Sequence, residues 1–166
     1  MKLYRLSLLL LLTVSTSLAA QERTTASALK VSGEVKKPLA LSVADIAKMK
    51  RISVSMKDRD GKDQRYTGVA MQDILGLAGV STGRDLRGEN LSKFLLVKCA
   101  DGYEVLFSLA EMDSSFTDRT VILADEWEGK PLPDGKGPFR LVVPGEKKPA
   151  RSCFQVTEFV IRFAKE

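Results

Sequence analysis

Short runs in which apolar and polar residues alternate recur along the chain, and this period of two predicts β-strands. In one run Ile52, Val54 and Met56 alternate with polar residues, and a tight-turn sequence follows at 58–61. Other alternating or continuously apolar runs predict further strands, with room for a bulge in the last. They cover residues 29–35, 66–68, 94–98, 104–107, 120–124, 139–143 and 154–163.

Three segments carry the signals of short helices. Ser42 is a suitable N-cap for a helix over residues 43–49. Residues 70–78 place their apolar side chains on one side of a helix. That stripe consists of Met71, Ile74, Leu75 and Ala78. Ser108 and Glu111 have the spacing of a capping box and predict a short helix there, which accounts for Glu111 without a ligand.

The order of these elements indicates the fold class. Strands are numerous, helices are few and short, and the two do not alternate regularly, so we expect an α+β fold with a mixed β-sheet and short helices. Residues 29–166 suit one domain with a sizeable core, and the small polar residues 21–28 predict a flexible lead-in. Residues 125–136, which include the single tryptophan, Trp127, predict a loop.

Residues 1–20 predict a secretory signal peptide. Lys2 and Arg5 precede an apolar run, and small residues at 17–20 provide a cleavage site. A membrane anchor needs about twenty apolar residues, and this run has roughly half that length. We therefore expect a periplasmic or secreted protein with no membrane insertion after cleavage.

The composition excludes several classes of protein. The chain contains no histidine, which rules out Ser-His-Asp and Cys-His catalysis and any zinc or haem site that depends on histidine. Without Lys2 and Arg5, 24 basic residues face 21 acidic ones. This excess is too small to indicate a nucleic-acid partner.

Cys99 and Cys153 are the two cysteines of the chain. Two cysteines alone do not ligate an iron–sulfur cluster, and in an exported protein a pair suggests a disulfide. A bond between them would close a loop of roughly 55 residues and stabilise the fold by about 4 kcal/mol on the chain-entropy model. The sequence leaves both states open, a disulfide and two free thiols.

The segment 137–152 combines an apolar strand with a basic loop. Arg140 lies on the strand, where a buried guanidinium group requires an anionic or carbonyl partner. From residue 136 to residue 152 the bases are Lys136, Arg140, Lys147, Lys148 and Arg151, and the only acid is Glu146. Such a loop is suited to hold an anion, although a solvated turn has the same composition.

Five short motifs occur in an order that resembles the molybdopterin-binding domain of the sulfite oxidase family. They lie at residues 66–69, 100–103, 122–125, 129–132 and 137–145. Each is weak alone, but five in order are specific, and together they span nearly all of the chain after residue 28. The resemblance implies an α+β domain that cradles a pterin cofactor.

The same resemblance implies a set of pterin-binding residues. A pterin is a flat ring system, and its site needs carboxylates or carbonyls at the ring edge, a flat wall for stacking, and donors for the side chain or phosphate. Three of the candidates also have a purely structural explanation. It is a turn residue for Asp101, packing on the sheet for Tyr103, and a hydrophobic side chain that covers a loop for Trp127. The candidates are the carboxylates Asp101 and Asp125, the walls Tyr103 and Trp127, and the donors Arg140, Arg151 and Ser152.

The enzymes of the family hold molybdenum through a cysteine thiolate twelve residues before the glycine that matches Gly68, and that position here is Met56. A thioether carries no negative charge and does not replace a thiolate on a high-valent metal. We therefore expect a bound pterin, free or molybdopterin-like, without molybdenum, and the sequence favours a non-catalytic protein over an enzyme.

The resemblance is greatest to small exported members of the fold that bind free pterins and pass the signal to a membrane-bound partner. It implies an exported pterin-binding module that works as a ligand sensor or as an accessory partner of a membrane signalling protein. One alternative is a molybdopterin-dependent oxidoreductase or its cofactor-binding subunit. Another is a scaffold that kept the fold and lost the ligand.

Overall fold

The structure, a computed structural model, describes residues 29–58 and 60–164. The signal peptide expected at 1–20 and the lead-in expected at 21–28 lie outside the described residues. Within the described ranges, no helix combines the length and the apolar character that crossing a membrane requires.

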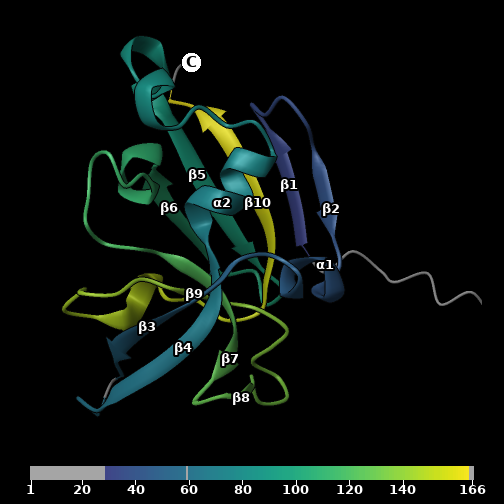
Figure 1. Cartoon of the computed structure of the whole chain (residues 1–166), viewed down its shortest axis with the longest axis vertical. Helices are drawn as coiled ribbons and strands as arrows, with labels where there is room; N and C mark the ends of the chain where they lie inside the picture. Colours follow the sequence, from purple (N-terminus) through teal and green to yellow (C-terminus); the bar gives the residue numbers. More distant parts are fainter. Residues whose placement is uncertain (1–28, 59, 165–166) are drawn as a thin grey trace, which may run out of the picture.

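Five strands build the first of two sheets. In spatial order they are β2 (Leu39–Leu41), β1 (Leu29–Gly33), β10 (Val156–Phe163), β5 (Lys93–Cys99) and β6 (Glu104–Ser108). β1 and β10 run parallel and the other neighbours run antiparallel, so the sheet is mixed, as expected. β10 therefore lies at the centre of the sheet, between β1 from the beginning of the described chain and β5 from its middle (Figure 1).

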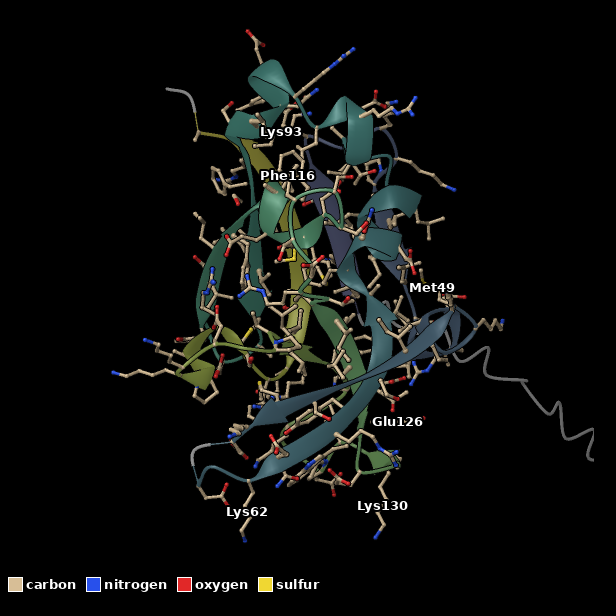
Figure 2. All side chains as sticks on the ribbon, turned by 60° about the vertical axis from the view of Figure 1, so that its left-hand side comes forward. Met49, Lys62, Lys93, Phe116, Glu126 and Lys130 are labelled. Atoms are coloured by element: carbon tan, nitrogen blue, oxygen red, sulfur yellow. The ribbon has the colours of Figure 1, made fainter. Side chains whose placement is uncertain are left out.

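The second sheet is antiparallel throughout. It consists of β3 (Arg51–Lys57), β4 (Asp63–Ala70), β7 (Ile122–Trp127) and β8 (Lys130–Pro131), and β9 (Arg140–Val142) also pairs with β7. Figure 2 places Lys62 in the β3–β4 turn and Lys130 in β8 at one end of the molecule, with Lys93 at the other. The hairpin predicted from the alternating residues before position 58 is confirmed.

The helices are short and lie mostly at the ends of strands. The α-helices are α1 (Val43–Ala47) and α2 (Met71–Leu77), and the 3-10 helices are η1 (Gly83–Asp85), η2 (Gly88–Ser92), η3 (Leu109–Met112) and η4 (Pro149–Arg151). Ser42 caps α1, and the predicted capping box of Ser108 and Glu111 is present at η3. All four residues of the predicted apolar stripe of α2 are buried.

The apolar core has two parts. The larger packs α2 against the first sheet and includes Ile74, Leu95 and Phe159. The smaller belongs to the second sheet and consists of Met56, Tyr66, Ile122, Ala124 and Val142. A backbone bridge between Arg140 and Phe154 brings β9 next to the chain that enters β10, so the two sheets meet at this point.

Three details of the sequence prediction are wrong. The loop expected at 125–136 begins too early, because β7 continues through Trp127, which pairs with Tyr66 beyond a bulge. β2 and β8 were not expected, since two or three residues carry no readable period. Residues 139–143 are buried on both faces, where the alternation indicated one.

Candidate functional site

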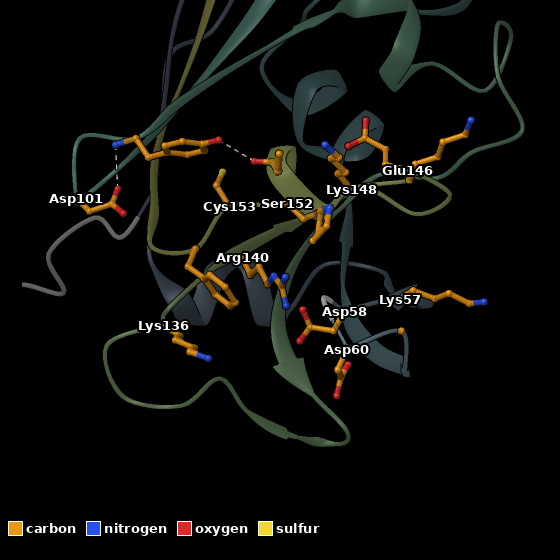
Figure 3. Close-up of a pocket in the computed structure, with 16 residues that line it drawn as sticks. Lys57, Asp58, Asp60, Asp101, Lys136, Arg140, Glu146, Lys148, Ser152 and Cys153 are labelled. Carbon is orange, nitrogen blue, oxygen red and sulfur yellow. Dashed lines mark hydrogen bonds between the residues drawn. The ribbon is translucent and has the colours of Figure 1, made fainter.

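A cavity of about 1160 Å³ opens where the two sheets meet. Its walls come from the β3–β4 turn, the β5–β6 turn, β9 with the residue at 136, and the chain from 146 to 154 (Figure 3). The volume is ample for a flat bicyclic ligand with a side chain. The lining includes five bases, Lys57, Lys136, Arg140, Lys147 and Lys148, and four acids, Asp58, Asp60, Asp101 and Glu146.

Arg140 is the buried charge of this cavity, with 3% of its surface exposed. Its guanidinium group lies between two aromatic rings, 4.7 Å from the centroid of Tyr66 and 4.0 Å from that of Phe154. One terminal nitrogen donates a hydrogen bond to the Tyr66 hydroxyl group. The Nε atom is buried and, among the described residues, has no hydrogen-bond partner.

Burial determines the electrostatics of this group. Loss of water lowers the pKa of Arg140, and the neighbouring Tyr66 and Asp58 offset part of that effect. Figure 3 shows the Arg140 side chain directed toward Asp58. A buried cation that retains an unused N–H donor is stabilised by an anionic or carbonyl group that enters the cavity.

Aromatic rings continue on both sides of Arg140. The rings of Tyr66 and Trp127 stack with their centroids 6.3 Å apart and their planes at 13°. The Lys136 ammonium group lies 5.2 Å from the ring centroid of Phe154 and 5.9 Å from that of Trp127. Phe154, Lys136 and Arg140 all line the cavity, so its wall combines an aromatic ring with two cations in contact with that ring.

Asp101 and Tyr103 line the opposite wall, on the β5–β6 turn. The Tyr103 amide donates to the Asp101 carboxylate over 2.9 Å, and the Tyr103 hydroxyl group donates to the Ala150 carbonyl over 3.0 Å. Tyr103 is 47% exposed, so its ring remains available as a stacking surface.

Ser152 lines the cavity, but its hydroxyl group already has partners. It accepts from the Val143 amide over 3.0 Å and donates to the Met56 sulfur over 3.1 Å. Met56 is 4% exposed. The residue at the position of the family's metal-binding cysteine is therefore a buried thioether that accepts a hydrogen bond.

Arg151 lies in an ion-pair network outside the set of residues that line the cavity. Its guanidinium group pairs with Glu111 over 2.9 Å and with Glu146, and it lies 4.4 Å from the ring centroid of Phe107. Arg119 joins the same two carboxylates over 3.4 and 3.7 Å. Glu111 therefore has these ion pairs in addition to its capping bond.

Asp125 and Trp127 are also placed outside that lining set. Arg51 donates to both carboxylate oxygens of Asp125, one of them over 3.0 Å. The Trp127 indole N–H donates to the Gln64 side chain over 2.8 Å. The structure thus brings Asp101, Tyr103, Arg140 and Ser152 together at the cavity and gives Asp125, Trp127 and Arg151 other contacts.

The two cysteines are free and buried. Cys153 lines the cavity.

Sequence reasoning missed Tyr66 and Phe154 as parts of the site. Tyr66 opens one of the five motifs, and its alternation with Gln64 was a signal for a buried ring. Phe154 had no signal of its own, because it was assigned to a strand that in fact begins at Val156.

Comparison with known proteins agrees with this architecture. A family model described as the oxidoreductase molybdopterin binding domain matches residues 52–148. The crystal structure of the sulfane dehydrogenase SoxCD from Paracoccus pantotrophus is similar, with a TM-score of 0.64 and 21% identity over 83% of this chain. The match covers 39% of the SoxCD chain, so this chain spans about two fifths of its length. A search of curated proteins finds no match.

These findings confirm the α+β fold of the sulfite oxidase type that the motifs predicted. The family match covers more than half of the chain, including β3, β4, β7 and β9. The chain therefore belongs to the oxidoreductase molybdopterin-binding domain family.

Proposed function

We propose that this protein is an exported, non-catalytic module that binds a pterin and acts as a ligand sensor or accessory partner of a membrane signalling protein. The observation that carries the proposal is Arg140, a buried guanidinium group that lines the cavity, lies between two rings and has one N–H without a hydrogen-bond partner among the described residues. A pterin suits this site, since its ring carbonyl or an acidic side chain pairs with the guanidinium group while its flat face meets the exposed ring of Tyr103.

The residues at the site suit the pterin better than they suit its metal. Met56 presents a neutral sulfur that already accepts from Ser152, and a thioether is a poor ligand for a hard, oxidised metal. We therefore propose that binding takes place without molybdenum chemistry through Met56.

Mass spectrometry of small molecules released from the purified protein tests the proposal. A pterin at near-stoichiometric amount is expected. The Arg140→Lys variant keeps the charge but loses the planar group and Nε, and it should bind at least about tenfold more weakly, as expected for a charged hydrogen bond worth about 1.5–3 kcal/mol. Arg162→Lys, an exposed position on β10, is the matched control and should bind normally. Equal binding by both variants would contradict the proposal.

Export and the membrane partner are separate parts of the proposal. Export predicts that protein recovered from the periplasm or medium begins near residue 21, which N-terminal sequencing measures. If the protein has a membrane partner, the yield of crosslinks to a membrane protein should increase when pterin is added. In the Arg140→Lys variant the crosslink yield should be the same with and without pterin. If the yield in the unmodified protein also does not change with pterin, the result would argue for a structural scaffold.

A second candidate is a molybdopterin-dependent oxidoreductase or its cofactor-binding subunit, favoured by the family match and by the thiol of Cys153 in the cavity wall. Elemental analysis of protein from a host that makes the cofactor separates the two. Stoichiometric molybdenum in the unmodified protein, lost in Cys153→Ser, would support this candidate and overturn the first.

A further inference from the structure

Cys99 and Cys153 meet beside the cavity, and the function proposed above does not use them. Cys99 ends β5, and Cys153 lies three residues before β10. Each is 6% exposed and carries a free thiol. The sequence contains no other cysteine, so any intramolecular disulfide must join these two.

Backbone hydrogen bonds hold the segments that carry the two cysteines next to each other. The Ala100 amide donates to the Gln155 carbonyl over 2.9 Å, and the Leu141 amide donates to the Cys153 carbonyl over 2.9 Å. Val156 lies opposite Cys99 in the ladder between β5 and β10. Because hydrogen bonds fix both main chains, the fold itself holds the two cysteine-bearing segments side by side.

The two cysteines also belong to segments that form two different sides of the cavity. Asp101 and Tyr103 follow Cys99 on one side, and the segment 146–152 precedes Cys153 on the other. The Tyr103 hydroxyl bond to the Ala150 carbonyl connects the same two sides (Figure 3), but Tyr103 is 47% exposed and water competes for this bond. A covalent link between the thiols would hold the two sides together where this hydrogen bond is weak.

We propose that Cys99 and Cys153 form a reversible dithiol–disulfide pair whose oxidation joins the two sides of the cavity and stiffens the site. Cys153 lines the cavity, so after loss of its proton to water its thiolate attacks a small external disulfide such as oxidised glutathione and forms a mixed disulfide, releasing one glutathione thiolate that takes up a proton. The Cys99 sulfur then displaces the second glutathione from Cys153. Two protein thiols are oxidised, one external disulfide is reduced, and the two thiol protons end on the two glutathione molecules.

The surroundings suit an uncharged product. Burial raises the pKa of both thiols, so the reactive thiolate is scarce at neutral pH and oxidation is slow, whereas the disulfide product carries no charge. A thiolate retained at this position would be a buried charge with Asp101 nearby, which Coulomb repulsion disfavours.

Peptide mapping of the whole protein after incubation with oxidised glutathione tests the chemistry. We expect a peptide that joins Cys99 to Cys153, the loss of both alkylatable thiols, and recovery of both with dithiothreitol. Non-reducing electrophoresis should show a monomer. A stable glutathione adduct on Cys153, a disulfide-linked dimer, or two thiols that remain alkylatable would each overturn the proposal.

Amide hydrogen exchange tests the stiffening without any ligand. Residues 100–103 and 147–152 should exchange about tenfold more slowly in the oxidised protein, and residues 43–47 of α1, which do not line the cavity, should not change. The Cys99→Ser variant, which cannot form the bond, is the control and should show no response to the oxidant. Equal exchange in the reduced and oxidised forms of the unmodified protein would refute the stiffening.

Titration with pterin-6-carboxylate, a fluorescent pterin, extends the test and rests on the proposed function. The oxidised protein should bind roughly two- to tenfold more tightly, because less ordering of the cavity walls accompanies binding. Equal affinity in both states would refute the link between the thiols and binding. A pterin that binds in neither state would contradict the proposed function, while a linked peptide and slowed exchange would still support the thiol pair.

Discussion

The Ser152 hydroxyl group donates a hydrogen bond to the Met56 sulfur over 3.1 Å, although 96 positions separate the two residues. The resemblance to the family implies a metal-binding cysteine at position 56. The sulfur here is neutral, buried and already paired through Ser152 to the Val143 amide. The role of this sulfur can therefore be tested by substitution.

Met56→Cys should restore a thiol at this position. The smaller side chain leaves space in the minor core, and we expect a loss of about 1–2 kcal/mol in the free energy of unfolding, measured with urea. In a host that makes the cofactor, the variant should retain more molybdenum than the unmodified protein. Met49→Cys, at a half-buried residue after α1, is the control. Molybdenum contents that do not differ would argue against the role assigned to Met56.

Tyr66→Phe removes the hydroxyl group that accepts from Arg140. A second buried N–H of Arg140 then lacks a partner in the free protein, so the free energy of unfolding should fall by about 1–3 kcal/mol. Pterin affinity should also fall, because the guanidinium group is less firmly held. Thermal unfolding and fluorescence titration measure the two effects. A variant as stable as the unmodified protein would indicate that the Tyr66 hydroxyl group does not support Arg140.

Asp113→Asn tests a buried carboxylate far from the cavity. Burial alone would raise the pKa of Asp113, but amide donors from Gly83 and Ser115 lower it below its ordinary value. At pH 7 the substitution should cost about 1–3 kcal/mol of unfolding free energy, since an asparagine NH₂ group would face one of these donors. Asp118→Asn, on the same loop and exposed, is the control and should have little effect.

The cost of Asp113→Asn should depend on pH in a defined direction. A carboxyl group whose pKa is lowered by folding contributes stability that is present above its unfolded pKa of about 3.9 and is lost as the pH falls through the folded value. The difference between the two proteins should therefore shrink below about pH 4. A difference that stays constant down to pH 2 would show that Asp113 acts through packing alone.

Arg151→Met tests the ion-pair network with Glu111. Burial would raise the pKa of Glu111, but bonds from Arg151 and the Ser108 amide lower it. The network is about one third exposed, so we expect a loss of only about 1 kcal/mol at pH 7 that declines in acid as Glu111 is protonated. Salt should reduce this loss as well. If the loss of unfolding free energy is independent of both pH and salt, it comes from the packing of Arg151 on Phe107 and not from the ion pairs.

The fold could be predicted where the sequence signal is local. The stripe of α2, the capping box at Ser108 and the turn at Asp101 each need only a few neighbouring residues, and all three are present. The length of β7 could not be predicted in this way. Its last residues follow no apolar pattern and are held in the sheet by β4, which lies more than fifty positions earlier.

The site was predicted only in part for the same reason. An arginine on an apolar strand requires a partner for its buried charge, so Arg140 could be identified from the sequence. Its partner Tyr66 lies 74 positions away, and the pairing of Arg51 with Asp125 spans the same separation. Charge and residue type do not reveal which of several carboxylates a given arginine contacts, so Asp125 and Arg151 were assigned to the pterin without knowledge of these ion pairs.

The central place of β10 has a consequence for biosynthesis. β1 pairs with β10 on one side and β5 pairs with it on the other, so the earlier strands lack their common neighbour while the ribosome is still translating. The second sheet contains no strand later than β9 and can assemble sooner. The first sheet can then be completed only after β10 has left the ribosomal exit tunnel, so the two sheets form at different stages of synthesis.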